Sequence, residues 1–92
     1  MTLPASTAAS TVTIRYFAWL RERVGESQET VDTGAATVRE LVAELRGRDE
    51  AHALAFDDMR SVRVAVDQQL TDLDAPLAGA AEVAFFPPMT GG

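Results

Sequence analysis

The 92-residue chain contains no cysteine. It therefore has no disulfide bond, no thiol nucleophile and no side chain that could hold a persulfide. Lysine is absent as well, because the basic residues are all arginine: Arg15, Arg21, Arg23, Arg39, Arg46, Arg48, Arg60 and Arg63. The chain therefore has no ε-amine that could form a Schiff base or receive an acyl group. If the chain takes part in acyl chemistry, it is the acyl donor, through the carboxylate of Gly92.

The residues that usually bind metals are also scarce. His52 is the single histidine, and a zinc site needs more nitrogen or sulfur ligands than this sequence offers. The aspartates Asp57-Asp58 and Asp72 with Asp74 do not have the spacing of a calcium loop, so we interpret them as surface charge. We expect no metal and no cofactor to be bound by this chain.

The net charge and the short apolar runs limit the kinds of partner that this chain can bind. The formal net charge of −6 disfavours nucleic acid and favours a partner with a basic surface. No apolar run is long enough to span a bilayer, and residues 1–11 lack the basic and apolar regions of a secretory signal. We therefore expect no membrane partner, a cytoplasmic location and a disordered extension over residues 1–11.

Alternation of apolar and polar residues predicts several strands. In residues 12–18, the side chains of Val12, Ile14 and Tyr16 face one way, while Phe17 faces the other. Further strands are predicted at 29–33, 62–66, 70–71 and 82–86, with a turn at 67–69. In the last strand the alternation turns Val83 and Phe85 inward and Ala84 and Phe86 outward.

Helical periodicity is clearest after Thr37. Residues 37–40 form a capping-box pattern, and an apolar stripe at i, i+3, i+4 and i+7 follows: Val38, Leu41, Val42 and Leu45. Gly47 is the expected stop. Residues 19–25 are interpreted as a basic connector with a turn at Gly25. Residues 51–56 are expected to form a short helical turn in which Leu54 and Phe56 close the core.

This order of elements predicts one α+β domain, since the chain has 47% hydrophobic residues and a length typical of a single small core. We expect a mixed sheet of about five strands with one main helix packed on one face. A β-grasp (ubiquitin-like) arrangement fits, with the first and last strands parallel at the centre. The domain then spans residues 12–86, and residues 87–92 form a flexible tail.

The tail Pro87-Pro88-Met89-Thr90-Gly91-Gly92 has a composition suited to threading. Two prolines end the last strand, because proline has no amide for the ladder. Glycine is a poor choice for local stability but leaves no side chain to block a narrow passage. Extended, these six residues reach roughly 20 Å, at about 3.3–3.6 Å per residue. We interpret the tail as the working part and the folded domain as its carrier.

Three segments resemble the small, sulfur-carrying subunit of molybdopterin synthase, a family of ubiquitin-like β-grasp sulfur carriers. Residues 16–22, followed by Gly25, are similar to its first-strand signature, and residues 64–68 to its third-strand turn. Residues 82–88, followed by Gly91-Gly92, resemble its C-terminus, and the similarity covers residues 12–92. The chain departs from the family at 79–81, where Gly-Ala-Ala stands in place of an Asp-Gly-Asp turn.

The resemblance implies that Gly92 is the reacting residue. A ubiquitin-activating-type adenylyltransferase, which uses ATP and Mg, would adenylate the Gly92 carboxylate, and a sulfur donor protein would convert it to a thiocarboxylate. The large subunit of molybdopterin synthase, in a heterotetramer, would then receive the tail and use the sulfur on cyclic pyranopterin monophosphate. The catalytic residues would lie on that large subunit, so this chain would be a non-catalytic, sulfur-donating subunit.

Phe17, Ala84 and Phe86 are predicted to bind the partner, because they lie on the outer face near the tail, with Ala65 extending the patch. Trp19 fits either a core edge or an interface. Three alternatives remain: a related carrier for thiamine or cysteine biosynthesis, a ubiquitin-like protein modifier, and a β-grasp interaction module with an inert tail.

Overall fold

The computed structural model describes residues 10–88. Its elements follow in this order: β1 (Ser10–Tyr16), α1 (Trp19–Val24), β2 (Gln28–Thr33), α2 (Val38–Arg46), α3 (Glu50–Ala55), a 3₁₀ helix (Met59–Ser61), β3 (Arg63–Val66), β4 (Gln69–Thr71) and β5 (Glu82–Phe86).

The five strands form one mixed sheet in the order β2-β1-β5-β3-β4. β1 and β5 pair in parallel, and the other neighbouring strands pair antiparallel. The first and last strands of this sheet therefore lie side by side at its centre, as predicted. The fold is an α+β β-grasp fold.

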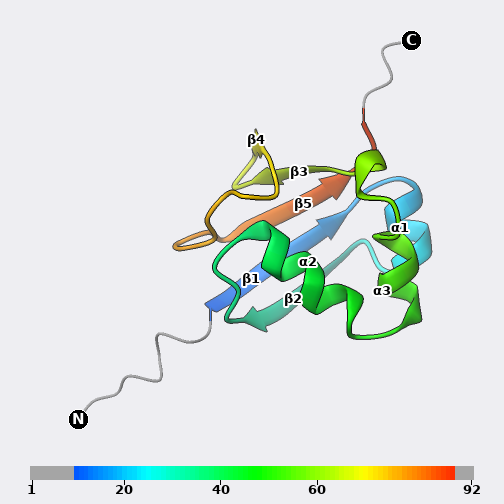
Figure 1. The fold of residues 1–92 in the computed structure, drawn as a ribbon, viewed down its shortest axis with the longest axis horizontal. Coiled ribbons are helices and arrows are strands. Elements are labelled where there is room, and N and C mark those ends of the chain that lie inside the picture. Colours follow the sequence, from blue (N-terminus) through cyan, green and yellow to red (C-terminus); the bar gives the residue numbers. More distant parts are fainter. Residues whose placement is uncertain (1–9, 89–92) are drawn as a thin grey trace.

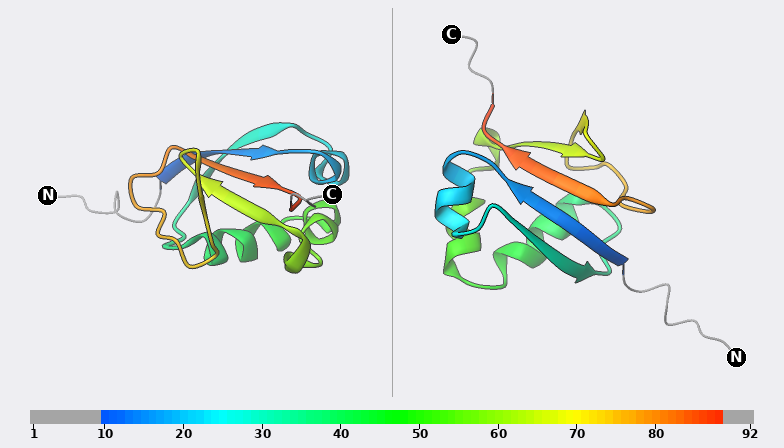
Figure 2. Two further views of the ribbon diagram at one scale, coloured as in Figure 1. Left: turned by 90° about the horizontal axis from the view of Figure 1, so that it is seen from above. Right: turned by 180° about the vertical axis from the view of Figure 1, so that it is seen from behind.

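The sheet has one covered face and one open face. α2 and α3 cross the front of the sheet in Figure 1, and the view from above in Figure 2 places both on the same side of it. The view from behind in Figure 2 shows β1, β5 and β3 with no helix over them. α1 lies at the end of the sheet and packs beside α3. The two faces of the central strands thus meet different surroundings.

The core lies between the sheet and the helices. Strand alternation gives it Ile14, Tyr16 and Phe85, all almost fully buried, and α2 contributes its predicted apolar stripe. Phe56 packs edge-on against Phe85 with 4.9 Å between ring centroids, and Tyr16 stacks on Phe85 at 6.2 Å. Burying each such side chain stabilises the fold by about 1.5–3 kcal/mol, so these rings fix how the helices lie on the sheet.

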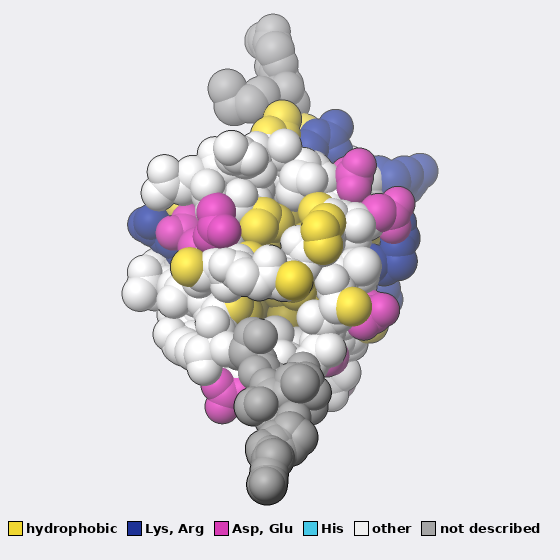
Figure 3. Space-filling view, turned by 90° about the vertical axis from the view of Figure 1, so that its left-hand side faces the viewer, with side chains coloured by type: hydrophobic (Ala, Val, Ile, Leu, Met, Phe, Trp, Pro, Cys, Tyr) yellow, Lys and Arg dark blue, Asp and Glu magenta, His cyan; other side chains and the backbone are white. Residues whose placement is uncertain are grey.

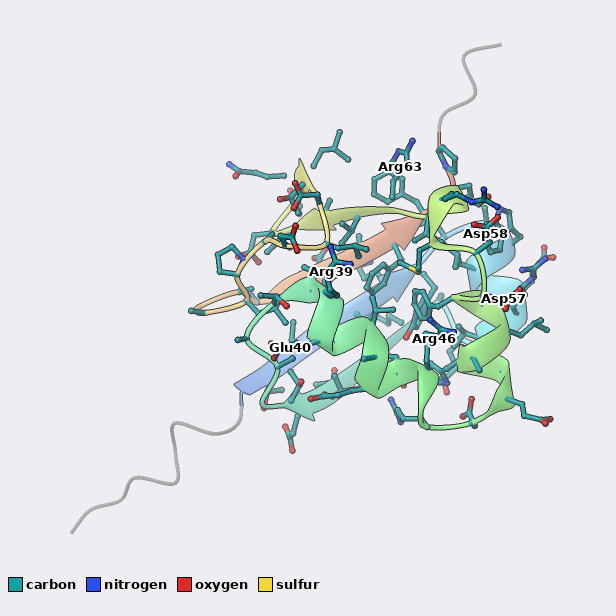
Figure 4. The ribbon with its side chains drawn as sticks, in the orientation of Figure 1. Arg39, Glu40, Arg46, Asp57, Asp58 and Arg63 are labelled. Carbon is teal, nitrogen blue, oxygen red and sulfur yellow. The ribbon has the colours of Figure 1, made fainter. Side chains whose placement is uncertain are left out.

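The ends of α2 follow the predicted signals. The hydroxyl of Thr37 accepts a hydrogen bond from the Glu40 N–H at 3.2 Å. The Glu40 carboxylate accepts from the Ala36 N–H at 2.9 Å, one residue before the cap, so the reciprocal bond is displaced from the usual capping box. The N–H of Gly47 donates to the Ala43 carbonyl at the C-terminal end. Glu40 and Arg46 stand near the two ends of this helix in Figure 4.

The prediction that residues 19–25 form a connector is wrong, because Trp19–Val24 is the helix α1. Leu20 is the only fully buried residue of this helix, so the sequence shows no apolar period there. The turn at Gly25 is confirmed: this residue ends α1 in the left-handed conformation, with φ of 94°.

The prediction for α3 is correct in position and wrong for one side chain. Phe56 closes the core, but Leu54 is 57% exposed and points away from it. His52, Ala55 and Phe56 face the core instead, at i, i+3 and i+4. β1 begins at Ser10, two residues before the predicted start of the domain.

Candidate functional site

The base of the tail lies where β5 ends. Phe86 is the last residue of β5, and the half-buried Pro87 and Pro88 follow it. Arg63 of β3 stands opposite Phe86 in the antiparallel ladder, and Figure 4 shows Arg63 at the corner from which the chain leaves the sheet. Met89, Thr90, Gly91 and Gly92 lie outside the described residues. Their predicted roles in threading and chemistry stay predictions.

A row of outward side chains crosses the open face. Arg15 of β1 stands opposite Ala84 of β5, Ala84 opposite Ala65 of β3, and Ala65 opposite Leu70 of β4. The two alanines make a shallow floor between larger neighbours. Leu70, at the β4 end of this row, is 71% exposed. The structure therefore brings these residues of four strands onto one surface, which we call the open-face row.

The three predicted partner-binding residues differ in how much surface they offer. Phe17, just after β1, is 42% exposed, and the guanidinium of Arg15 lies 5.5 Å from its ring centroid. Phe86 is half-buried. Ala84 faces outward by alternation but is only 7% exposed, so it contributes shape more than area. Among residues 10–88 no ring stacking joins Phe17 to Phe86, although both lie near the strand ends that lead to the tail.

Further apolar side chains gather at the opposite end of the molecule. Figure 3 shows them in the middle of that end, with carboxylates on both sides. This region holds the connection between β4 and β5, where Leu77 is buried and Leu73 is half-buried. These two leucines anchor the loop that connects β4 to β5.

The turn before β5 is stabilised by a side chain that is distant in the sequence. Gly79 adopts φ of 78°, a conformation that favours glycine. The carboxylate of Asp67, in the turn between β3 and β4, accepts hydrogen bonds from the N–H groups of Ala81 and Glu82 at 2.9 and 3.0 Å. An aspartate remote in sequence thus holds the start of β5.

Sequence reasoning missed a buried polar cluster on the covered side. His52 is 5% exposed, and its ring nitrogens lie 2.8 Å from carboxylate oxygens of Glu29 and Asp49. The hydroxyl of Tyr16 donates to Glu29 at 2.7 Å, and Arg48 pairs with Glu29 at 3.0 Å. We call these five residues the histidine cluster. The sequence contains no motif that indicates this cluster, because the partners of His52 come from three separate segments of the chain.

The histidine cluster shifts the pKa values of its members. Burial alone lowers the pKa of His52, but hydrogen bonds to Glu29 and Asp49 outweigh it and raise the pKa. Burial raises the pKa of Glu29, and the hydrogen bonds from His52 and Tyr16 with the charge of Arg48 bring it below its ordinary value. The pKa of Tyr16 is raised far above its usual range, mainly by burial and also by the hydrogen bond to Glu29. The cluster is therefore an ion-paired tie between α3 and the sheet.

The remaining singled-out residues have structural contacts. Trp19 is half-buried at the core edge, and the guanidinium of Arg23 lies 4.6 Å from its ring centroid. The carboxylate of Asp58 pairs with Arg60, and that of Asp74 with Arg39. Within residues 10–88 no group of three or more His, Asp or Glu side chains is arranged to hold a metal ion. None of the helices described is both long and apolar enough to cross a bilayer.

Comparison with known sequences gives consistent relatives. Residues 14–92 match the model of the ThiS family. The chain is 38% identical over 81 residues to the molybdopterin synthase sulfur carrier subunit of Escherichia coli (strain K12), covering 88% of this chain and 99% of that protein. The protein of the same name from Haemophilus influenzae is 32% identical over 79 residues, covering 86% of this chain and 96% of that protein.

Solved structures agree with these relatives. Small archaeal modifier protein 1 of Haloferax volcanii superposes with a TM-score of 0.66 at 28% identity, covering 87% of this chain and 99% of that chain. A putative molybdopterin converting factor, subunit 1, from Pyrococcus furiosus superposes with a TM-score of 0.65 at 25% identity, covering 86% of this chain and 98% of that chain. The similarity thus extends over nearly the whole length of these proteins.

Proposed function

The chain belongs to the ThiS family, and from this membership we propose that it is the sulfur carrier subunit of a molybdopterin synthase. The observation that carries the proposal is the family match through Gly92, together with a central strand that runs directly into Pro87-Pro88. The two curated relatives carry this function in their names. The absence of cysteine fits this proposal, because the chain has no thiol that could carry sulfur as a persulfide.

The chemistry proposed for Gly92 has two steps. Its carboxylate attacks the α-phosphate of ATP on an adenylyltransferase, giving an acyl adenylate and pyrophosphate. Hydrosulfide supplied by a sulfur donor protein then attacks the acyl carbon and displaces AMP, which leaves a thiocarboxylate and a proton. Magnesium and ATP belong to the activating enzyme. This chain supplies a carboxylate and a tether, because the sulfur arrives already held near its acceptor.

The proposed acceptor is cyclic pyranopterin monophosphate, bound by the large synthase subunit. The open-face row, with Phe17 and Phe86, would dock on that subunit, and residues 87–92 would reach into its active site. The geometry supports this docking, because the open-face row crosses β5, the strand that leads to the tail. Sulfur transfer would return Gly92 to its carboxylate form for another round.

Removal of Gly91 and Gly92 tests the chemistry. The shortened protein should keep the wild-type unfolding midpoint but give no molybdopterin when mixed with the activating enzyme, a sulfur donor, the large subunit and the pterin substrate. Mass spectrometry of the intact chain should show the exchange of one oxygen for sulfur only when Gly92 is present. Undiminished synthesis by the shortened protein would rule out the proposal.

Phe86→Ala tests the docking face. We expect binding to the large subunit to weaken about tenfold or more, because an aromatic side chain at the centre of an interface often contributes 2 kcal/mol or more. Calorimetric titration gives the affinity. Leu54→Ala, an exposed apolar residue on α3, is the matched control and should bind normally. Equal affinity for the Phe86 variant and wild type contradicts the docking face.

A second function is favoured by the solved structures. The Haloferax volcanii neighbour is named a small archaeal modifier protein, so Gly92 could instead form an isopeptide with lysines of other proteins. Without lysine this chain could not extend such a conjugate into lysine-linked polymers. Expression of an N-terminally tagged chain distinguishes the two functions: a modifier gives covalent adducts of higher mass, and a carrier gives only the free chain and its thiocarboxylate.

A further inference from the structure

One edge of the sheet is open for strand pairing. β2 is an outermost strand, and it pairs with β1 on one side only. The N–H of Tyr16 donates to the carbonyl of Ser27, which fixes the alternation of the antiparallel ladder. Glu29 and Val31 therefore bond to β1, while the N–H and C=O groups of Thr30 and Asp32 point away from it. Within the described residues no other segment pairs with this side of β2.

β2 carries the acidic residues Glu29 and Asp32 but lacks the other features that usually protect a sheet edge. It is six residues long and contains no proline and no lysine. β4, at the other edge, is only three residues long and offers little backbone to a partner. Natural proteins shorten or charge their edges, or interrupt them with proline, because an open edge recruits further strands. The open edge of β2 is therefore a candidate site for pairing with a strand of another protein.

A groove accompanies this edge. It has a volume of about 400 Å³ and lies between β2 and α2. Val31, Leu41 and Leu45 form its apolar floor, and Thr30, Asp32, Glu44 and Arg48 surround it. A strand added beside β2 would place every second side chain over this groove. The free backbone edge of β2 and the groove therefore lie on the same surface. We call this surface the β2 groove.

Charge selects the occupant of the β2 groove. Arg48 is committed to Glu29 by the ion pair at 3.0 Å, so its charge is already balanced. Asp32 and Glu44 are both exposed, and their hydrogen-bond partners, Thr11 and Thr33, are neutral hydroxyls. The whole chain carries a net charge of −6. Acidic groups at the rim attract a basic segment and disfavour a second copy of this acidic chain.

We propose that the β2 groove binds an extended segment of a partner protein with arginine or lysine at alternating positions. The segment adds to β2 as a further strand, in the manner of β-augmentation, with main-chain hydrogen bonds to Thr30 and Asp32. Side chains at alternating positions share one face of a strand, so the basic ones all lie over the groove that Asp32 and Glu44 line. β1 lies between β2 and β5, so a partner held on the outer edge of β2 leaves the open-face row free.

A peptide titration followed by NMR amide shifts tests this proposal on the full chain. The probe is acetyl-Lys-Val-Arg-Val-Lys-Val-amide. A second peptide, with proline in place of each valine, keeps the charge but loses alternate amide donors. We expect saturable shifts confined to β2 and α2 with the first peptide, and at least tenfold weaker binding of the second. Binding should also weaken as salt rises, because the charges are exposed.

Two sets of variants localise the binding. Thr30→Pro removes an outward amide without breaking the ladder to β1 and should weaken binding about tenfold. Asp32→Asn combined with Glu44→Gln keeps the backbone intact and should weaken it about threefold or more, so the proposal stays testable if the proline variant does not fold. Glu22→Gln combined with Glu50→Gln makes the same change of charge on α1 and α3 and should have no effect.

Three results would overturn the proposal. Equal affinity for the valine and proline peptides would mean that charge alone drives binding. Shifts on β3, β4 or β5 in place of β2 would put the site elsewhere. A concentration-dependent change at β2 without peptide, with faster sedimentation, would assign the edge to self-association in place of a basic partner.

Discussion

At the scale of single residues, the histidine cluster shows how burial turns ordinary side chains into a structural tie. Both ring nitrogens of His52 face carboxylate oxygens, an arrangement that only a doubly protonated, positively charged imidazole satisfies. Glu29 is held in turn by Tyr16 and Arg48. Because these groups come from β1, β2 and α3 and the connection between α2 and α3, the cluster joins segments that are distant in sequence.

Tyr16→Phe tests the hydroxyl of this cluster. The variant keeps the buried ring and loses only the hydrogen bond to Glu29. We expect the free energy of unfolding to fall by about 1.5–3 kcal/mol, the usual contribution of a hydrogen bond to a charged group. Urea denaturation measures the change. Thr11→Val, which removes a hydroxyl bond to Asp32 at an exposed position, should cost less and serves as the control.

The pH dependence of stability tests the charge on His52. Its pKa is raised in the folded protein, so its contribution is full below the unfolded value, about 6.5, and is lost as pH rises through the folded pKa. The pKa values of Glu29 and Asp49 are lowered, so their contribution is present above about 4 and is lost as pH falls.

His52→Gln should therefore remove a pH-dependent part of the stability. We expect the wild type to exceed the variant most between about pH 5 and pH 6.5, and the difference to shrink toward alkaline pH. Urea unfolding midpoints of both proteins across this range provide the measurement. A constant difference from acidic to alkaline pH would contradict a charged imidazole in the folded state.

At the scale of elements, the two glycines that end α1 and α2 serve different purposes. Gly25 has φ of 94°, and nothing lies within 4 Å of the position of an added Cβ. Gly47 has φ of −84°, and an added Cβ would meet only backbone oxygens at 3.6 Å. The first position needs glycine for its backbone conformation, and the second does not.

Substitution by alanine separates these two cases. Gly25→Ala should lower the free energy of unfolding by about 1–2 kcal/mol, the cost of a left-handed backbone for an L-residue, since sterics add nothing there. Gly47→Ala should change it by less than about 1 kcal/mol and raise it if the helix gains a turn. Thermal or urea unfolding of the pair decides the matter, and equal losses would contradict the assigned conformations.

At the scale of the whole molecule, the core and the proposed docking surface lie on opposite faces of one sheet. The covered face holds the core, and the open face carries the open-face row beside the base of the tail. Phe85 and Phe86 are neighbours in sequence, yet Phe85 is fully buried and Phe86 is half-buried on the other face. The same strand therefore contributes to the core and to the proposed docking surface, and we expect a substitution on one face to leave the other face largely unchanged.

Phe85→Ala and Phe17→Ala test this separation. Loss of the buried ring should cost about 3–5 kcal/mol, much of the stability of a domain of this size. Loss of the exposed Phe17 ring should cost about 1 kcal/mol or less, the order of its cation–π contact with Arg15. Urea denaturation compares the two variants, and similar losses would mean that Phe17 belongs to the core.

The sequence by itself determined the strands, α2 and the prolines that end β5. These features depend on local periodicity and on proline and glycine, which act within a few residues. It also gave the outward direction of Ala84, but not that neighbouring strands would leave this side chain only 7% exposed.

Only the tertiary structure decided the helical form of Trp19–Val24, the exposure of Leu54, the histidine cluster and the β2 groove. Each of these depends on which distant segments come together. A short helix with one buried residue has no period to detect, and an ion pair between β2 and α3 leaves no spacing in the chain. The physical reason is that burial and pairing are properties of neighbours in space, whereas propensity and periodicity are properties of neighbours in sequence.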